Sequence, residues 1–153
     1  LDAKISWNEK THTVELFKNG ITVRPELIDT SYTSDDMKWL AKIVHAEAQG
    51  ESTEGKIAVA NVVLNRTKSN LFPNNIYDVI FDTQFGVQFT PISNGAIYNE
   101  PSVHSYHAAK KALFGQNVAG ESLYFCNPII STNFWISANR PFYKTIGNHD
   151  FYL

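Results

Sequence analysis

The spacing of apolar residues predicts a helix over residues 33–50. Apolar positions recur every three or four residues there, so they share one face that is expected to pack in a core. Ser34 suits the N-cap of this helix, and Gly50 suits its C-terminal end. The face consists of Met37, Leu40, Ile43, Val44 and Glu47. A carboxylic acid therefore completes a stripe that is otherwise apolar.

The position of Glu47 admits two interpretations. If its side chain is buried with the stripe, the charged form is disfavoured, the pKa rises, and the neutral acid persists toward neutral pH. A general acid needs that property. If the end of the helix rises to the surface instead, Glu47 is an ordinary solvated residue. The pattern alone leaves both interpretations open.

Further helices and strands follow from the same kind of pattern. A second helix over residues 56–69, capped by Ser52, is apolar on most sides and is expected to be buried, so its Asn61 and Asn65 need hydrogen-bond partners. A short helix is expected around Ile76, Val79 and Ile80, and another over residues 101–114 with Val103, Tyr106 and Leu113 inward. The long segment 82–100 is expected to be an irregular binding loop. Residues 123–126 form a predicted strand, and residues 143–146 and 149–152 a predicted hairpin that turns at Gly147-Asn148.

The first 32 residues have a different pattern. Apolar and polar residues alternate in short runs, with turn residues at 8–11 and 19–20, which is typical of a small antiparallel β-meander. Polar residues around Pro25 and residues 29–31 then indicate a linker. We therefore expect an α+β protein in which this meander, residues 1–32, precedes a mainly helical domain with short antiparallel strands, residues 33–153.

Composition excludes several functions. The 153 residues are 43% hydrophobic and 18% charged, as in ordinary globular proteins. A net charge of −2 without a Lys/Arg run argues against nucleic-acid binding, and no apolar stretch is long enough to span a membrane. The single Cys126 allows no internal disulfide. Because the chain begins at Leu1 without a signal sequence, we expect it to be a piece of a longer or processed protein.

The run Ala46-Glu47-Ala48-Gln49-Gly50-Glu51 closely resembles the motif of the SleB/CwlJ cell-wall hydrolase family, the spore cortex-lytic enzymes and their relatives. The resemblance continues in order through residues 55–66, 72–74, 79–81, 88–90, 119–128 and 146–151, and it covers residues 36–153. It implies a lysozyme-like fold and cleavage of the glycan strands of peptidoglycan. It also implies that Glu47 is the catalytic acid.

The other site residues depend on the same resemblance. Glu51 lines the cleft or holds the turn, and the expected substrate-binding residues are Glu51, Gln88, Phe89, Thr90, Tyr124 and Asn127. Aromatic side chains among them would offer stacking faces to sugar rings. With only one acid convincingly placed, a lytic transglycosylase that leaves 1,6-anhydromuramoyl ends is the first interpretation. The alternatives are a two-carboxylate hydrolase, acting as a muramidase or glucosaminidase, a non-catalytic peptidoglycan-binding module, and a metal-dependent amidase that acts on the peptide stems.

No metal or other cofactor is expected. His45-Ala46-Glu47 and His104-x-x-His107 lack the partners that known zinc motifs require, and Cys126 fits a small core residue better than a nucleophile. Peptidoglycan is the expected partner of an exported, monomeric enzyme of the cell wall or spore envelope. The sequence leaves open whether the enzyme acts on spore cortex during germination or on the vegetative wall. Residues 5–8 and 13–16 weakly resemble repeats of copper amine oxidase N-terminal-like stalk domains, which implies a stalk or wall-binding module.

Overall fold

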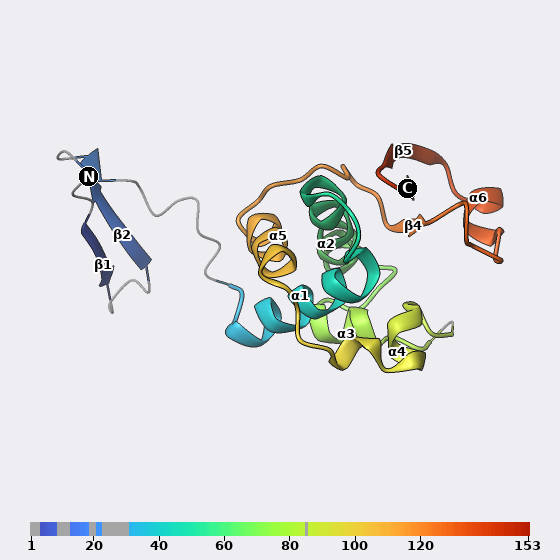
Figure 1. Ribbon diagram of the computed structural model, residues 1–153, viewed down its shortest axis with the longest axis horizontal. Helices are drawn as coiled ribbons and strands as arrows, with labels where there is room; N and C mark the ends of the chain where they lie inside the picture. The colour runs from blue at the N-terminus through green and yellow to red at the C-terminus, as the bar shows by residue number, and fades with distance from the viewer. Residues whose placement is uncertain (1–3, 9–12, 19–20, 23–30, 85) are drawn as a thin grey trace. The chain divides into compact units, whose positions relative to one another are not determined.

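The computed structural model describes residues 4–8, 13–18, 21–22, 31–84 and 86–153, and the chain divides into two compact units, Leu1–Thr33 and Ser34–Leu153. The described part of the first unit is an antiparallel sheet of β1 (Lys4–Asn8), β2 (Thr13–Lys18) and β3 (Ile21–Thr22), in that order (Figure 1). This confirms the expected meander. The turns expected near residues 8–11 and 19–20, and the linker around Pro25, fall largely or wholly outside the described residues.

Helices dominate the second unit, as the sequence pattern predicts. They are α1 (Ser34–Ala48), α2 (Thr53–Lys68), α3 (Ile76–Phe81), α4 (Thr90–Asn94), the short 3₁₀ helix η2 (Ala96–Tyr98), α5 (Val103–Leu113) and α6 (Trp135–Asn139). The predicted helices around residues 33–50, 56–69, 76–80 and 101–114 are confirmed within a few residues at their ends. Helix α1 starts at Ser34 itself, so this residue is not the cap that was expected before the helix.

Helix α2 lies at the centre of the helical layer. Ser52 Oγ accepts a hydrogen bond from the Gly55 backbone N–H at 3.2 Å, which confirms the expected N-cap. Small and β-branched residues along the helix are buried, and α2 contacts both α1 and α5 (Figure 1). Leu40, Ile43 and Val44 of α1 are also fully buried, so the apolar stripe of that helix does face the core.

Helix α5 turns a different face inward from the one expected. Val103 is 68% exposed and Tyr106 is also exposed, whereas Leu113 is buried as predicted. The buried face is built from small residues, namely Ser105, Ala108, Ala109 and Ala112. Small side chains let α5 approach α1 and α2 closely, and this close packing outweighs the burial of two larger residues.

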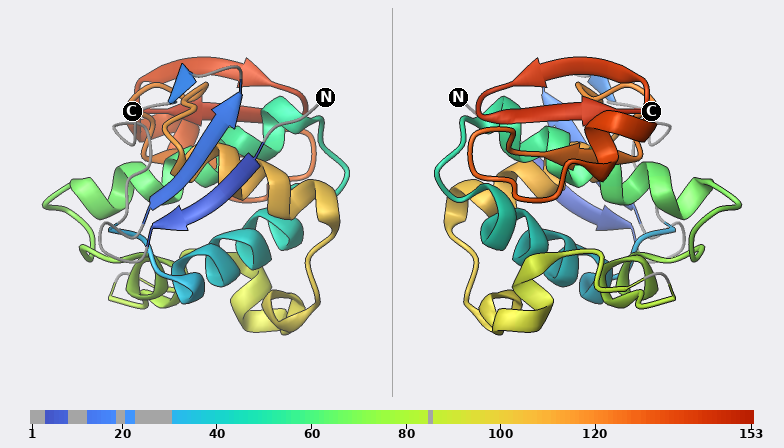
Figure 2. Two further views of the ribbon diagram at one scale, coloured as in Figure 1. Left: turned by 90° about the vertical axis from the view of Figure 1, so that its left-hand side faces the viewer. Right: turned by 90° about the vertical axis from the view of Figure 1, so that its right-hand side faces the viewer.

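The C-terminal strands form a three-stranded antiparallel sheet beside the helices, shown in red in Figure 2. Its order is β4 (Tyr124–Cys126), β6 (His149–Tyr152) and β5 (Phe142–Ile146), with β6 in the middle. The expected strand and C-terminal hairpin are thus confirmed. Phe151 and Ile146 of the sheet pack against Ala58 and Val62 of α2, together with Ala119. This small cluster joins the sheet to the helical layer.

Buried polar side chains of α2 hold the irregular segment 116–123. Asn61 donates to Gln116 O at 2.8 Å and accepts from the Val118 N–H at 2.9 Å. Asn65 donates to Gly120 O and Ser122 O at 2.8 and 3.0 Å. The expectation that both asparagines find partners is confirmed. Because this segment leads directly into β4, the bonds set the position of Tyr124.

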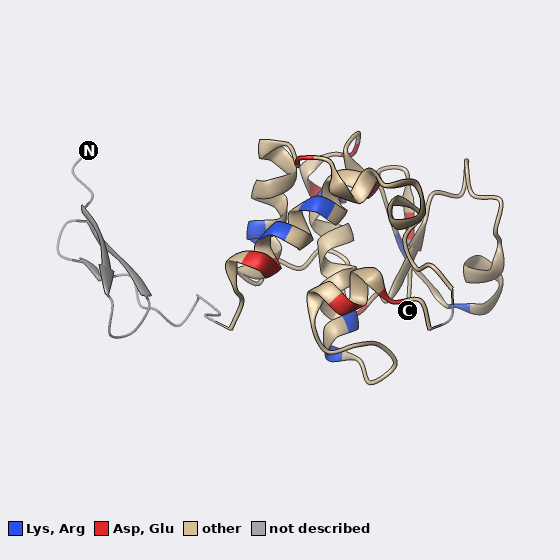
Figure 3. Ribbon diagram, turned by 90° about the horizontal axis from the view of Figure 1, so that it is seen from below, with Lys and Arg blue, Asp and Glu red and all other residues tan. Residues whose placement is uncertain are grey.

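The segment 82–100 is less irregular than expected, because α4 and η2 occupy part of it. Gly95, at φ +79°, separates the two short helices in the left-handed conformation that glycine tolerates. In the described part of the second unit, acidic and basic residues are interspersed along the ribbon (Figure 3). Among the described residues, no helix has the length and apolar character of a membrane span.

Candidate active site

Glu47 lies in the last turn of α1, at the end of the buried stripe. The residues before it on that stripe, Ile43 and Val44, are fully buried, and Glu47 itself is half-buried. Burial raises the pKa of Glu47 from its ordinary 4.5 to about 7, and the positive charge of Arg66 opposes the rise. The carboxyl group can therefore both give and take a proton near neutral pH.

Arg66, near the C-terminal end of α2, is the buried cation whose charge acts on Glu47. It is 4% exposed, and its Nε donates to Leu123 O at 2.8 Å. Burial lowers the pKa of its guanidinium to about 10, so the group stays charged at neutral pH. Tyr124, Asp82 and Glu47, in decreasing order, favour that charged form.

Three aromatic rings surround the Arg66 guanidinium. Its Cζ lies 4.6 Å from the ring centroid of Phe72, 5.1 Å from that of Phe89 and 5.6 Å from that of Tyr124. A desolvated cation is attracted to ring faces at such distances. The rings thus hold the charge in place without an acidic side chain in direct ion-pair contact among the described residues.

Gln88 and Phe89 reach this cluster from the segment before α4. Gln88 Oε1 lies 3.5 Å from Arg66 Nη1, at the long end for a hydrogen bond, and Gln88 Nε2 donates to Gly86 O at 3.1 Å. Phe89 is only 2% exposed and packs against Phe125, with ring centroids 6.3 Å apart. The stacking role expected for Phe89 is corrected here, because a buried ring offers no face to a sugar. The ring supports Arg66 from the core instead.

Tyr124, the first residue of β4, is half-buried and stands next to the same cation. Its ring meets those of Phe72 and Trp135 edge to face, with centroids 6.0 and 6.5 Å apart. A second guanidinium, that of Arg140, places its Cζ 4.5 Å from the Tyr124 ring centroid. Tyr124 therefore links the surroundings of Glu47 to residues of the segment after β4.

Glu51 holds the turn between β5 and β6. Its Oε2 accepts from the Asn148 backbone N–H at 3.1 Å and its Oε1 from Asn148 Nδ2 at 2.9 Å. Burial acts to raise the pKa of Glu51, but these two hydrogen bonds, His149 and Lys56 outweigh it and lower the pKa. Gly147 (φ +60°) lies so close that an added Cβ would overlap the Glu51 carboxylate. Both carboxylate oxygens are thus engaged in a contact that fixes the hairpin.

Thr90 and Asn127 make hydrogen bonds with their own neighbours in the chain and none with the residues around Arg66 that the structure describes. Thr90 is exposed at the first position of α4, and its backbone O accepts from Ser93 Oγ at 2.9 Å. Asn127 Oδ1 accepts from the Ile129 N–H at 3.0 Å, which forms the turn that ends β4. Of the six expected binding residues, Gln88, Phe89 and Tyr124 gather around Arg66. The interactions of Glu51, Thr90 and Asn127 are with turns and helix ends.

The histidines and Cys126 have structural surroundings. His45 Nδ1 accepts from the Ser102 N–H at 3.3 Å at the start of α5. Burial lowers the pKa of His149, whose Nδ1 lies 3.8 Å from Glu51 Oε1. Burial raises the pKa of the Cys126 thiol, which keeps it in its unreactive neutral form. In the described ranges, no three His, Cys, Asp or Glu side chains are grouped closely enough to hold a metal ion.

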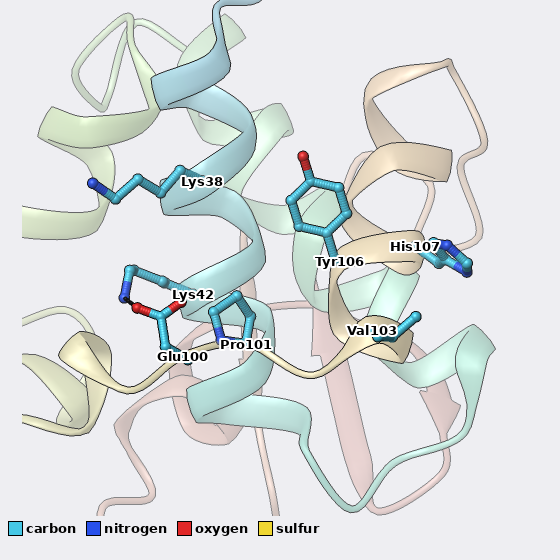
Figure 4. A pocket seen from close by; sticks show the side chains of 7 residues that line it. All are labelled: Lys38, Lys42, Glu100, Pro101, Val103, Tyr106 and His107. Carbon is cyan, nitrogen blue, oxygen red and sulfur yellow. Dashed lines mark ion pairs between the residues drawn. The ribbon is translucent and has the colours of Figure 1, made fainter.

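A separate hollow of about 330 Å³ lies between α1 and α5 (Figure 4). Lys42 Nζ at its edge donates to the backbone O atoms of Tyr98 and Asn99, both at 3.1 Å, and lies 3.6 Å from Glu100 Oε1. Its lining residues are Lys38, Lys42, Glu100, Pro101, Val103, Tyr106 and His107. None of them belongs to the cluster around Glu47 and Arg66, and we assign the chemistry to that cluster.

Sequence reasoning did not single out Arg66, Asp82 or Arg140 as site residues. Arg66 closes the run of matching motif positions, but a lone arginine near the end of an apolar helix gives no sign that it is buried among rings. A usable signal was present nonetheless: on the predicted buried helix, Arg66 follows Asn65, so it too had to find partners inside the protein.

Comparison with known proteins identifies the family of this fold. The sequence profile of the family described as Cell Wall Hydrolase matches residues 50–152. The spore cortex-lytic enzyme of Bacillus subtilis is 40% identical over 120 residues, which is 78% of this chain and 38% of that protein. The spore cortex-lytic enzyme of Oceanobacillus iheyensis is 39% identical over 124 residues, 81% of this chain and 44% of that protein. The chain thus spans less than half the length of these relatives.

Solved structures give the same answer. The catalytic domain of the germination-specific lytic transglycosylase SleB from Bacillus anthracis superposes with a TM-score of 0.74 at 36% identity, covering 82% of this chain and 100% of that domain. The catalytic domain of the Bacillus cereus SleB protein gives a TM-score of 0.72 at 36% identity, covering 83% and 96%. The family and fold expected from the motifs are confirmed.

Proposed function

The chain belongs to the cell wall hydrolase family, and we propose that its Ser34–Leu153 unit cleaves the glycan strands of peptidoglycan as a lytic transglycosylase. The similarity to spore cortex-lytic enzymes and to the catalytic domain of a germination-specific lytic transglycosylase supports this proposal. The same relatives support the spore cortex as the substrate and germination as the setting.

The observation that carries the mechanism is the burial of Glu47, with its pKa near 7. The neutral acid donates its proton to the glycosidic oxygen as the bond to the anomeric carbon breaks. The resulting carboxylate removes the proton from the 6-hydroxyl of the muramic residue, and that oxygen attacks the anomeric carbon of its own sugar. A 1,6-anhydro ring forms, no water is consumed, and Glu47 is protonated again. At pH 7 about half of the molecules hold the acid form, against about 0.3% for a carboxyl of pKa 4.5.

Arg66 supports both steps of this cycle. Its fixed positive charge favours the carboxylate that the first proton transfer produces. It therefore keeps the pKa of Glu47 low enough for the acid to release its proton. The rings of Phe72, Phe89 and Tyr124 keep that charge in place. Preorganised charge of this kind needs no rearrangement during the reaction.

A single acid is enough for this chemistry, whereas most glycoside hydrolases use a second carboxylate as a base or a nucleophile. Glu51 was the expected candidate, and both of its oxygens accept hydrogen bonds from Asn148. This arrangement favours transglycosylation over the hydrolytic alternative. The raised pKa of Glu47 likewise favours an enzyme over a non-catalytic binding module, because a mere binder gains nothing from a buried acid.

For substrate binding, we propose direct contact by Gln88 and Tyr124, the two expected residues that are partly exposed next to Arg66. Phe89 would act by supporting Arg66. Contacts from Glu51, Thr90 and Asn127 remain part of the proposal, at the outer parts of the binding surface. We further propose that the enzyme is exported to the spore envelope, acts as a monomer without a cofactor, and carries in residues 1–32 the end of a stalk or wall-binding module.

Mass spectrometry of digested cortex peptidoglycan tests the reaction. A transglycosylase leaves muramic ends that are lighter by one water than those of a hydrolase and that take up no hydride from borohydride. Glu47→Gln, with an amide that supplies no proton, should reduce product release by several orders of magnitude, and Glu54→Gln at the exposed start of α2 is the matched control. Reducible ends would show that water is the acceptor, and an active, folded Glu47→Gln protein would remove Glu47 from the mechanism.

A further inference from the structure

Three side chains form a compact group beyond the surroundings of Glu47. They are Tyr124 in β4 and, after that strand, Trp135 and Arg140. Arg140 Cζ lies 4.5 Å from the ring centroid of Tyr124 and 5.3 Å from that of Trp135. The two rings meet edge to face, with centroids 6.5 Å apart. Aromatic rings offer a packing surface, and a guanidinium donates directed hydrogen bonds to carboxylate oxygens, so this group combines the two kinds of contact that an acidic sugar needs.

The guanidinium of Arg140 has unused hydrogen-bonding capacity. Its Nε is buried and has no hydrogen-bond partner, although buried N–H groups are normally paired. The ion pairs between described side chains involve Lys42, Lys144 and His149 and leave Arg140 out. The side chain thus presents a charged, planar donor group that the described protein atoms do not satisfy.

Trp135 provides the open surface of the group. Its side chain is 51% exposed, in contrast to the buried ring of Phe89. The backbone around it is fixed, because the Trp135 N–H donates to Asn133 Oδ1 at 2.9 Å and Asn139 Nδ2 donates to Trp135 O at 2.8 Å. The Arg140 N–H also donates to Ile136 O at 2.9 Å, so Trp135 begins the short helix α6 and Arg140 caps its C-terminal end.

Tyr124 connects this group to the proposed reaction centre. Its ring centroid lies 5.6 Å from Arg66 Cζ as well as 4.5 Å from Arg140 Cζ, and Arg66 is the charged neighbour of Glu47. Through Tyr124, the group therefore adjoins the cation whose charge acts on Glu47.

We propose that Tyr124, Trp135 and Arg140 form a saccharide subsite in which a sugar ring packs on Trp135 and the Arg140 guanidinium donates to an oxygen of the lactyl substituent of that sugar. This inference rests on the proposed function and deepens it. In peptidoglycan only the muramic residues carry a lactyl substituent, whose oxygen is a free carboxylate, the carbonyl that bears the peptide or, in cortex, a lactam carbonyl; N-acetyl oxygens occur on both kinds of sugar. Arg140 is then the residue that distinguishes muramic from glucosamine residues and fixes the register of the strand.

The test measures binding by the full chain in the Glu47→Gln background, so that the ligand is not cleaved. The probes are chitotetraose, a muramic-containing tetrasaccharide with free lactyl carboxylates, and a tetrasaccharide with muramic lactam. Arg140→Gln should weaken binding of the muramic ligands about tenfold and leave chitotetraose nearly unchanged, since a charge-assisted hydrogen bond is lost. Trp135→Ala should weaken all three by similar factors, because it removes only the packing surface. The lactam ligand shows whether the acceptor must be charged.

The chain offers a matched control. Lys110 Nζ lies 5.5 Å from the ring centroid of Phe114, an exposed cation–aromatic pair at the end of α5. Lys110→Gln and Phe114→Ala should change none of the three affinities. Arg140→Lys keeps the charge but lacks the planar guanidinium with its paired terminal donors, and it should lose part of the preference, which keeps the test informative if Arg140→Gln folds poorly.

Equal affinities in the parent and in both Arg140 variants would overturn the inference, as would an equal loss for chitotetraose and the muramic ligands in Arg140→Gln. Product release from peptidoglycan by the wild-type protein is measured in parallel. A wild-type protein that cleaves while the Arg140 variants bind normally leaves the proposed function standing and removes the subsite. A wild-type protein that releases no products removes the proposed function, and the binding ratios still decide whether the subsite exists.

Discussion

Replacing Glu47 by Gln should stabilise the protein at alkaline pH while it removes activity. The folded-state pKa of Glu47 is about 7, against 4.5 for the free side chain, so between these values the folded protein holds a proton that the unfolded chain releases. The favourable contribution of the neutral acid is complete below pH 4.5 and is lost as the pH rises through 7. The rise from 4.5 to about 7, at about 1.36 kcal/mol per pKa unit, corresponds to about 3 kcal/mol.

The amide of Gln resembles the neutral acid and does not titrate. Urea unfolding should therefore give similar free energies for wild type and Glu47→Gln at pH 4, and a free energy higher by about 3 kcal/mol for the variant at pH 8. Glu54→Gln is the control, because Glu54 is exposed and forms only a surface ion pair with Lys144 at 3.3 Å. Its difference from wild type should be small at both pH values. If the difference between Glu47→Gln and wild type were equal at pH 4 and pH 8, Glu47 would not be a buried acid, and the reasoning would fail.

Three further substitutions test other parts of the site. Arg66→Gln removes the charge that lowers the pKa of Glu47, so the alkaline limb of the activity profile should move to higher pH, and an unmoved limb would contradict the role of Arg66. Phe89→Ala should lower the free energy of unfolding by about 3–5 kcal/mol, with loss of activity that follows loss of fold; weaker substrate binding in a protein of unchanged stability would restore the stacking role. Gly147→Ala should lower the melting temperature, because the new Cβ overlaps the Glu51 carboxylate at φ +60°, whereas an unchanged melting temperature would show that the hairpin turn shifts at little cost.

The sequence pattern predicted the elements of the second unit well where periodicity and caps agreed. Ser52 caps α2, the stripe of α1 is buried up to Glu47, and the last hairpin turns at Gly147-Asn148. The pattern gave the wrong inward face for α5, because that face was chosen by the apolar character of Val103 and Tyr106, which are exposed. Interhelical distance decides that face, and distance is a property of the assembled fold rather than of the helix.

The site was only partly predictable for a related reason. Motif positions named Gln88, Phe89 and Tyr124, and these do lie together, but whether an aromatic ring faces solvent or core depends on what covers it. Phe89 is covered by Phe125 and Arg66, and the segment that presents Trp135 has no periodic pattern. Arg66 and Arg140 acquire their importance from rings contributed by other parts of the chain, which no local pattern encodes.

The attachment of segment 116–123 to α2 bears on how this surface meets a flexible polymer. The segment has no regular secondary structure, yet Asn61, Asn65 and Arg66 hold its backbone at several points. Its conformational entropy is therefore lost when the protein folds and not when a ligand binds. The backbone of Tyr124, which follows this segment, is therefore held in one position. A glycan strand must then adjust its own torsions to the protein on that side, and the entropic cost of association falls on the polymer rather than on the enzyme.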